Sequence, residues 1–119
     1  MPSVSVIIPV YNRGDLIRHT LESVRRASAG LTVEVVIVDD GSTEPAEVGI
    51  HRAGYKPERI IRQQNQGLLF ARLAGLQAAT GKYVLFLDSD DLVSAEKLHL
   101  QVAALEESGA AVSYTDTAR

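Results

Sequence analysis

The sequence predicts an α/β protein in which a mainly parallel β-sheet lies between helices on both sides, giving three layers. Short apolar runs alternate along the chain with segments of helical periodicity, in the order βαβαβαβαβ. The apolar runs are continuous instead of alternating with polar residues, which is typical of strands that are buried on both faces of a parallel sheet. The connections between these segments are short, as one compact domain requires.

The first half of the chain contains two predicted strands and two predicted helices. Val4–Val10 is rich in β-branched residues and ends in a polar turn, so it is predicted to be a buried strand. Asp15–Ser28 carries apolar residues at helical spacing, and the acidic residue at its start suits the positive end of a helix. Val33–Val38 is the second predicted strand. Pro45–Ala53 is predicted to be a short helix, because proline is favourable at a helix start.

The second half continues the same alternation. Arg59–Arg62 is predicted to be a short strand, Leu68–Thr80 a helix, and Tyr83–Leu87 a strand. Ser94 is a suitable N-cap for a helix that runs to Ser108, and Ala110–Tyr114 is the last predicted strand. The three longer helices each have an apolar stripe, formed by Ile17, Leu21, Val24 and Ala27, by Leu69, Leu73 and Leu76, and by Leu98, Val102 and Leu105.

The composition excludes several classes of protein. Of the 119 residues, 45% are apolar and 23% are charged, which is ordinary for a soluble globular chain and unlike a disordered one. No apolar run approaches the roughly 20 residues that a membrane span needs, and we expect no signal peptide. Cysteine is absent, so disulfides and thiolate metal sites are excluded. A net charge of −3 with mixed signs argues against a nucleic-acid partner.

Polar clusters follow three of the predicted strands. They are Tyr11-Asn12, Asp39-Asp40 and the run Asp88–Asp91. In an open parallel sheet, ligands bind at the carboxyl ends of the strands, so these clusters are expected to meet at one edge. Five carboxylates at that edge would repel one another, and a cation or hydrogen-bond donors must offset the repulsion.

The tripeptide Asp88-Ser89-Asp90 can be interpreted as a metal site. Residues i and i+2 of an extended strand end point to the same side, so both carboxylates can face one hard cation. Mg²⁺ or Mn²⁺ is typically held by one or two carboxylates together with substrate phosphates and water, which suggests a metal bridge to a diphosphate. The alternative is a loop before a helix, in which aspartate is common for capping reasons alone.

Other residues at this edge have similar pairs of interpretations. A carboxylate of Asp39 or Asp40 can accept hydrogen bonds from a base or a ribose, or can simply belong to a turn. The ring of Tyr11 can stack on a flat base, with Pro9 shaping the turn, or can pack in the core. Arg72 can oppose the carboxylates or reach a nucleotide, or can be an ordinary solvated charge.

Four segments together resemble the nucleotide-sugar-binding half of the family 2 glycosyltransferases, which have the GT-A fold with a Rossmann-like nucleotide-binding half. The resemblance covers nearly the whole chain, and the segments stand in the right order and spacing. One departure is Leu73, where the family often has asparagine. The segments are VSVIIPVYN (Val4–Asn12), VIVDDGS (Val36–Ser42), NQGLLFARLAG (Asn65–Gly75) and GKYVLFLDSDD (Gly81–Asp91).

The resemblance implies a role for each matching residue. Asp40, with Tyr11 and Pro9 nearby, would hold the nucleotide base, commonly uracil, and Arg72 would help to position it. Asp90 would be the chief ligand of Mg²⁺ or Mn²⁺. The implied nucleotide-binding residues are Pro9, Tyr11, Asp39, Asp40, Arg72, Asp88 and Ser89, the implied metal ligands are Asp90 and Asp88, and Asp91 is an auxiliary residue.

The resemblance also implies an activity. Family members of this type transfer a sugar from a nucleotide donor, UDP-sugar above all, to a glycan or lipid acceptor of the cell envelope, with inversion at the anomeric carbon. In them the general base and the acceptor region follow the fifth strand. The general base is therefore expected beyond Arg119, the last residue of this sequence, and no residue of the chain is assigned as catalytic.

Three further expectations follow from this resemblance. Residues 1–119 are expected to be a truncated donor-binding part that is inactive alone. Because such a part lacks its natural second half, it is expected to self-associate through an exposed face. We expect a cytoplasmic location, and for the full-length protein also the cytoplasmic face of a membrane.

Two other classes of function stay open at this point. A metal-dependent receiver or phosphatase-like domain also gathers aspartates at strand ends, but it has an acidic pair after its first strand, where this chain has Tyr11-Asn12. A non-catalytic domain of the same fold, using this face for protein contacts, is the second alternative.

Overall fold

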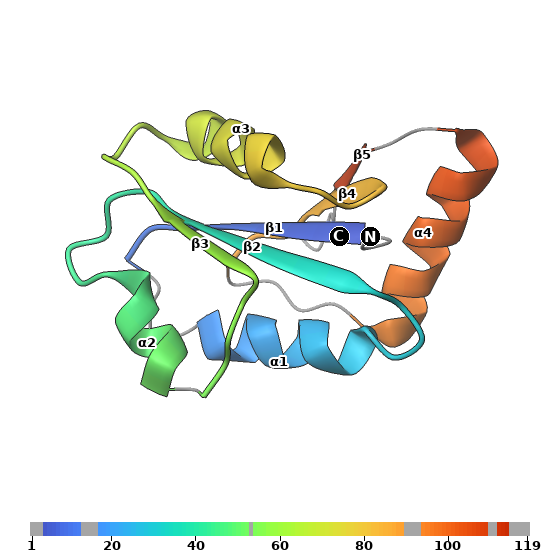
Figure 1. Ribbon diagram of the computed structural model, residues 1–119, viewed down its shortest axis with the longest axis horizontal. Helices are drawn as coiled ribbons and strands as arrows, with labels where there is room; N and C mark the ends of the chain where they lie inside the picture. The colour runs from blue at the N-terminus through green and yellow to red at the C-terminus, as the bar shows by residue number, and fades with distance from the viewer. Residues whose placement is uncertain (1–3, 13–16, 53, 90–93, 110–111, 115–119) are drawn as a thin grey trace.

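The computed structural model describes residues 4–12, 17–52, 54–89, 94–109 and 112–114, and strands and helices alternate along them as the sequence predicts (Figure 1). The strands are β1 (Val4–Val10), β2 (Val33–Asp39), β3 (Arg59–Arg62), β4 (Tyr83–Phe86) and β5 (Val112–Tyr114). The helices are α1 (Ile17–Ala27), α2 (Ala46–Arg52), α3 (Leu68–Ala78) and α4 (Ala95–Ser108).

The strands form one sheet in the order β3-β2-β1-β4-β5, and every pairing between them is parallel. The central strand β1 pairs with β2 on one side and with β4 on the other, so that Val4 lies opposite both Val33 and Tyr83. The chain first adds β2 and β3 on one side of β1 and then crosses to add β4 and β5 on the other side. The strand order therefore reverses between β1 and β4, which is where ligands bind in sheets of this kind.

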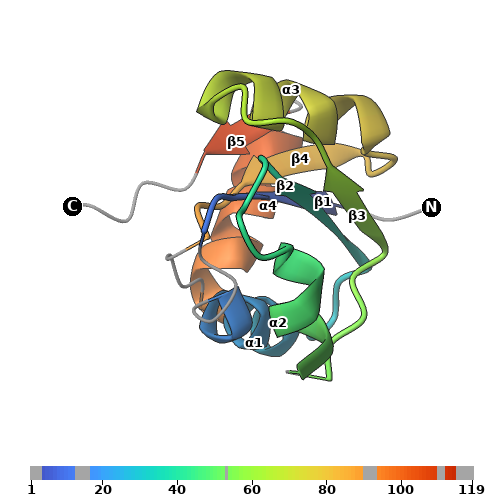
Figure 2. The same ribbon diagram turned by 90° about the vertical axis from the view of Figure 1, so that its left-hand side faces the viewer.

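Helices cover both faces of the sheet, as predicted. Figures 1 and 2 show α3 on one face and α1 and α2 on the other, and α4 packs against α1. The apolar stripes predicted for α1 and α4 are buried in the larger part of the core, together with Val4, Val6, Ile8 and Val10 of β1. Among the described residues, no helix has both the length and the apolar character needed to cross a bilayer.

Helix α3 uses small residues, not its leucines, to contact the sheet. Ala71 and Gly75 are its buried positions, whereas the stripe of Leu69, Leu73 and Leu76 is exposed. A β-carbon at Gly75 would come within 2.4 Å of Cγ2 of Ile7, so the helix can lie this close to β1 only because position 75 has no side chain. The apolar periodicity thus predicts the helix correctly but does not show which of its faces meets the sheet.

Several element ends differ from the sequence prediction. Helix α3 ends at Ala78 instead of Thr80, because Ala79 is extended and the Thr80 N–H and hydroxyl both donate to Glu34 at 2.8 Å. The predicted N-cap at Ser94 is confirmed, since its hydroxyl accepts a hydrogen bond from the Lys97 N–H at 3.1 Å. The predicted ends at Asp15, Ala53 and Ala110 lie outside the described residues, and so does Arg119, beyond which the general base is expected.

A buried carboxylate stabilises the edge of the sheet opposite the carboxyl ends of the strands. Glu34 on β2 accepts hydrogen bonds from the Ser5 hydroxyl at 2.7 Å and from both donors of Thr80, and it lies 3.7 Å from the Arg59 guanidinium. Burial by itself would raise the pKa of Glu34, but the hydrogen bonds and the arginine outweigh it and lower the pKa below its usual value. This residue therefore links β1, β2 and the connection from α3 to β4.

Acid is expected to remove the contribution of Glu34 to stability. Because the pKa is lowered by folding, the contribution is complete above the ordinary carboxyl pKa near 4.5 and is lost as the pH falls through the folded-state pKa. The Glu34→Gln variant should be less stable by about 1–3 kcal/mol at pH 7, since buried donors lose a charged acceptor. Urea unfolding from pH 7 to pH 3 should show this difference shrinking as the solution becomes acidic.

The matched control is Glu107→Gln, which changes an exposed glutamate of α4. It should leave the free energy of unfolding within about 0.5 kcal/mol of wild type at every pH. A difference between wild type and Glu34→Gln that stays constant down to pH 3 would contradict the assigned role of Glu34.

Candidate functional site

A pocket of about 260 Å³ opens at the carboxyl edge of the sheet, across the point where the strand order reverses. Its walls come from the ends of β1, β2 and β4 and from the first turn of α3. The volume is just below the range of about 300–1,000 Å³ that is usual for small-molecule sites. The lining residues are Pro9, Val10, Tyr11, Asp40, Leu68, Ala71, Asp88 and Ser89.

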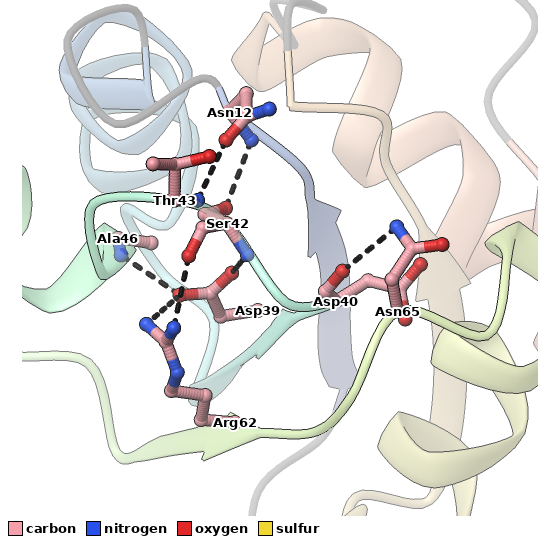
Figure 3. A network of polar contacts seen from close by, with 8 residues as sticks. All are labelled: Asn12, Asp39, Asp40, Ser42, Thr43, Ala46, Arg62 and Asn65. Atoms are coloured by element: carbon pink, nitrogen blue, oxygen red, sulfur yellow. Dashed lines mark hydrogen bonds and ion pairs between the residues drawn. The ribbon is translucent and has the colours of Figure 1, made fainter.

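Asn12 ties the end of β1 to the loop after β2. Its backbone N–H donates to the Ser42 hydroxyl at 2.8 Å, and its side-chain oxygen accepts a hydrogen bond from the Thr43 N–H at 2.9 Å (Figure 3). Asn12 has a positive φ of 54°, a conformation that asparagine tolerates better than most residues. These two bonds set the distance between Tyr11 and Asp40, which face the pocket from the two strands.

The carboxylate of Asp39 is directed into the protein. One oxygen accepts a hydrogen bond from the Ser42 N–H at 3.0 Å, and the other accepts from the Ala46 N–H at 2.8 Å and pairs with Arg62 at 3.3 Å (Figure 3). Asp39 is fully buried and does not line the pocket. Its contacts hold the loop after β2 and the start of α2, so they indicate a role in shaping the site.

The neighbouring carboxylate of Asp40 lines the pocket. One oxygen accepts hydrogen bonds from the Gln63 amide at 2.9 Å and the Gln66 N–H at 2.8 Å, and the other accepts from the Gly67 N–H at 2.9 Å. Burial would raise the pKa of Asp40, but these hydrogen bonds prevail and lower it below its usual value, so the group is ionised at neutral pH. A carboxylate has about four acceptor positions, which leaves one of them for a ligand donor.

An aromatic residue after β1 and a second carboxylate after the neighbouring strand β4 complete the lining of the pocket. Tyr11 is half exposed and lies beside Pro9 at the end of β1. Asp88, half exposed after β4, lies 3.5 Å from the guanidinium of Arg72, which also sits over the ring of Phe86 at 5.8 Å. Arg72 is therefore next to the pocket through Asp88, without lining it.

The segment that carries the predicted metal ligands is only partly described. Asp88 offers carboxylate oxygen at the pocket, the ligand type that Mg²⁺ and Mn²⁺ prefer, and the Ser89 carbonyl is held by the Thr20 hydroxyl at 2.6 Å. Asp90 and Asp91 lie outside the described residues. Within the described residues, no three His, Asp or Glu side chains come together as a metal site. A single carboxylate ligand such as Asp88 is compatible with a cation that takes its other ligands from phosphate and water.

The structure brings five of the predicted site residues to one pocket, and it adds residues that the sequence reasoning missed. Pro9, Tyr11, Asp40, Asp88 and Ser89 all line the pocket, as the positions at strand ends suggest. The missed wall residues are Val10, Leu68 and Ala71, and the missed supporting residues are Gln63, Gln66 and Gly67. The polar residues directly before α3 are the sequence feature from which these supporting residues could have been predicted.

A doubly wound parallel sheet with a pocket at its switch point is characteristic of Rossmann-like α/β proteins. Within this class, the family model for glycosyl transferase family 2 matches residues 5–118. The chain belongs to this family, which confirms the family that the sequence motifs resemble.

Curated relatives are similar over nearly the whole chain but are much longer. An uncharacterized glycosyltransferase of Rickettsia bellii is 41% identical over 118 residues, which are 98% of this chain and 17% of the relative. The succinoglycan biosynthesis protein ExoO of Rhizobium meliloti is 34% identical over 114 residues, which are 95% of this chain and 32% of the relative. The chain thus spans less than half the length of either relative.

Solved structures of glycosyltransferases have the same fold. Residues 1–349 of S. aureus TarS, in complex with UDP-GlcNAc, superpose with a TM-score of 0.73 at 33% identity, covering 87% of this chain and 31% of that chain. The mannosyltransferase PcManGT of Pyrobaculum calidifontis, in complex with GDP-Man and Mn²⁺, gives a TM-score of 0.73 at 27% identity and covers 87% and 32% of the two chains. The predicted GT-A architecture is confirmed by these similarities.

Proposed function

We propose that this chain is the donor-binding part of an inverting glycosyltransferase that uses a nucleoside diphosphate sugar, with UDP as the preferred nucleotide. The observation that carries the proposal is the pocket at the switch point, where Tyr11, Asp40 and Asp88 face one space from three strand ends. The structures that bind UDP-GlcNAc and GDP-Man support the class of donor.

In the proposed complex, the base lies between Tyr11 and Asp40. The exposed tyrosine ring offers a stacking surface, and the ionised carboxylate offers one remaining acceptor position to a base N–H. Uracil has such a donor at N3, whereas cytosine has none there. Guanine also has a ring N–H, so this contact does not separate UDP from GDP, and UDP is preferred because the structure in complex with UDP-GlcNAc has the higher identity, 33% against 27% for the one with GDP-Man. Asp39 acts through the loop that it holds.

Asp88, together with Asp90, is proposed to hold Mg²⁺ or Mn²⁺ against the diphosphate. The bound cation would neutralise negative charge on the departing diphosphate. Arg72, at 3.5 Å from Asp88, keeps this carboxylate at the pocket edge and adds positive charge there. Ser89 is proposed to lie beside the ribose, and Asp91 is proposed as an auxiliary residue of the same segment.

The acceptor site and the general base are proposed to belong to a region beyond Arg119 in a longer protein. Direct displacement requires a base on the acceptor hydroxyl, and none of the residues in the pocket is assigned to that task. The acceptor is proposed to be a glycan or a lipid, in line with the relative named for succinoglycan biosynthesis. The 119 residues alone are expected to bind donor nucleotide without transferring sugar.

Calorimetry with UDP tests the proposal directly. UDP with Mn²⁺ should bind, and leaving out the metal should weaken binding by about tenfold or more, which equals about 1.4 kcal/mol. CDP should bind at least about tenfold more weakly than UDP, because a polar site group is left without its partner. Asp88→Asn and Asp90→Ala should remove most of the metal dependence, while UDP binding without metal stays close to wild type.

Two outcomes would count against the proposal. No heat at high protein concentration would favour a non-catalytic domain of the same fold. Equal binding of UDP, CDP and adenosine diphosphate would show that Asp40 does not select the base. The receiver-type alternative is not favoured, because Tyr11, which follows β1 and lines the pocket, stands where that alternative needs an acidic pair.

A further inference from the structure

The outer face of α3 carries most of the exposed large apolar side chains of the described residues. Leu69, Phe70, Leu73 and Leu76 form this outer α3 face, with exposed fractions of 65%, 53%, 43% and 39%. Leu68, at the pocket end of the same helix, is also exposed. Single exposed leucines are normal on protein surfaces, but a contiguous group on one helix indicates an interaction surface.

The large side chains of α3 cannot simply turn inward. Ala71 and Gly75 already fill the contact with the sheet, and Ala74 and Ala78 pack beside them. A single added β-carbon at Gly75 would lie 3.2 Å from Val38 and closer still to Ile7. The bulky residues therefore face outward because the inner face accepts only small ones.

The spacing and charge of the outer α3 face suit a permanent helical contact. Leu69, Leu73 and Leu76 are separated by four and three residues, the spacing of a seam along which a second helix can pack. The only charged residue of α3 is Arg72, which reaches Asp88 beside the pocket. An apolar patch without charges at its centre resembles the core of an obligate interface more than that of a transient one.

We propose that the outer α3 face is covered by the acceptor-side region of the same polypeptide, the region that follows the matched segment in longer family members. The inference rests on the proposed function, because it assumes that this region exists. The relatives leave ample length for it, since this chain spans 17% of one and 32% of another. Strand β5 pairs in parallel with β4, so the chain leaves it at the pocket edge of the sheet, the same edge at which α3 begins with Leu68 (Figures 1 and 2).

This contact would join the two substrate sites. Leu68 lines the donor pocket and is the first residue of α3, so a segment packed along the outer α3 face reaches the pocket wall at its end. Ala71 lines the pocket from the end of the same first turn. The helix is thereby shared, with its inner face on the donor-binding sheet and its outer face on the acceptor-side region.

The absence of cysteine allows a labelling test. Leu73→Cys places a thiol on the outer α3 face, and Leu100→Cys places a matched one on α4, where the native leucine is 62% exposed. Both variants are made in the 119-residue chain and in the full product of its reading frame, and a maleimide is added. In the full product, the thiol at position 73 should react at least about tenfold more slowly than in the short chain, because reaction requires local opening. The thiol at position 100 should react equally in both.

Three results would overturn the inference. They are a reading frame that stops after Arg119, equal reaction rates at position 73 in the two proteins, and protection in the full product that appears only as its concentration rises. The last result would assign the face to a second copy of the chain. UDP calorimetry on both proteins separates this inference from the proposed function, since position 73 can be protected whether or not UDP binds.

Discussion

The Asp40→Asn variant is expected to bind UDP much more weakly than wild type. The carboxylate accepts hydrogen bonds from Gln63, Gln66 and Gly67, and an amide has only one oxygen to offer these donors. The side-chain nitrogen of the asparagine is itself a donor, and it would then face either a backbone N–H or the N–H of the base. Losing a hydrogen bond to a charged group costs about 1.5–3 kcal/mol, so UDP affinity should fall by about tenfold to a hundredfold.

Asp40→Asn should also loosen the loop that leads into α3. The Gln66 and Gly67 N–H groups lose a charged acceptor, and the free energy of unfolding should fall by about 1–3 kcal/mol. Thermal unfolding measures this loss separately from calorimetry with UDP. The control is Glu44→Gln, since Glu44 belongs to the loop after β2 but is exposed. UDP affinity of Asp40→Asn within twofold of wild type would exclude Asp40 as the base contact.

The Asp39→Ala variant is expected to be the most destabilised of the substitutions in the site. Its two oxygens accept hydrogen bonds from the Ser42 and Ala46 N–H groups and contact the Arg62 guanidinium, and the side chain is almost fully buried. Each buried donor left without an acceptor costs about 1–3 kcal/mol, so the total loss should be about 2–5 kcal/mol. Urea unfolding followed by circular dichroism measures it.

Asp88→Ala is the matched control, because its carboxylate is half exposed and also follows a strand at the carboxyl edge of the sheet. Its free energy of unfolding should stay within about 0.5 kcal/mol of wild type, since surface substitutions rarely exceed this. If Asp39→Ala were as stable as Asp88→Ala, the internal contacts of Asp39 would not support the loop after β2. The structural role given to Asp39 and the binding role given to Asp40 would then both have to be revised.

The apolar pattern predicts the fold well because it has a local cause. Continuous β-branched runs such as Val4–Val10 can be buried on both faces only in a covered sheet, and stripes such as the one from Ile17 to Ala27 require a helix against it. Turn residues after each run also place the polar clusters at strand ends. The family, the parallel sheet and the edge that holds the pocket are therefore readable from residues that are near one another in the chain.

Adjacent residues with the same side chain can be separated only by the folded structure. Asp39 and Asp40 are identical in type and lie at the same strand end, yet the alternation of a strand points one inward and the other to the pocket. Asp39 takes two donors from the loop and helix that follow it, but its partner Arg62 and the side-chain acceptor contacts of Asp40 with Gln63, Gln66 and Gly67 span 23 to 27 residues, which no local pattern connects.

The leucines of the outer α3 face show the same difference between what the sequence predicts and what the folded structure decides. Helical periodicity identifies a stripe at Leu69, Leu73 and Leu76, but a stripe of small residues occupies the opposite side of the helix. The space between α3 and β1, where Gly75 meets Ile7, decides that the small residues face the sheet. Local sequence therefore specifies the elements and the chemistry at their ends, whereas close packing between distant segments decides which face is buried and which carboxylate is available to a ligand.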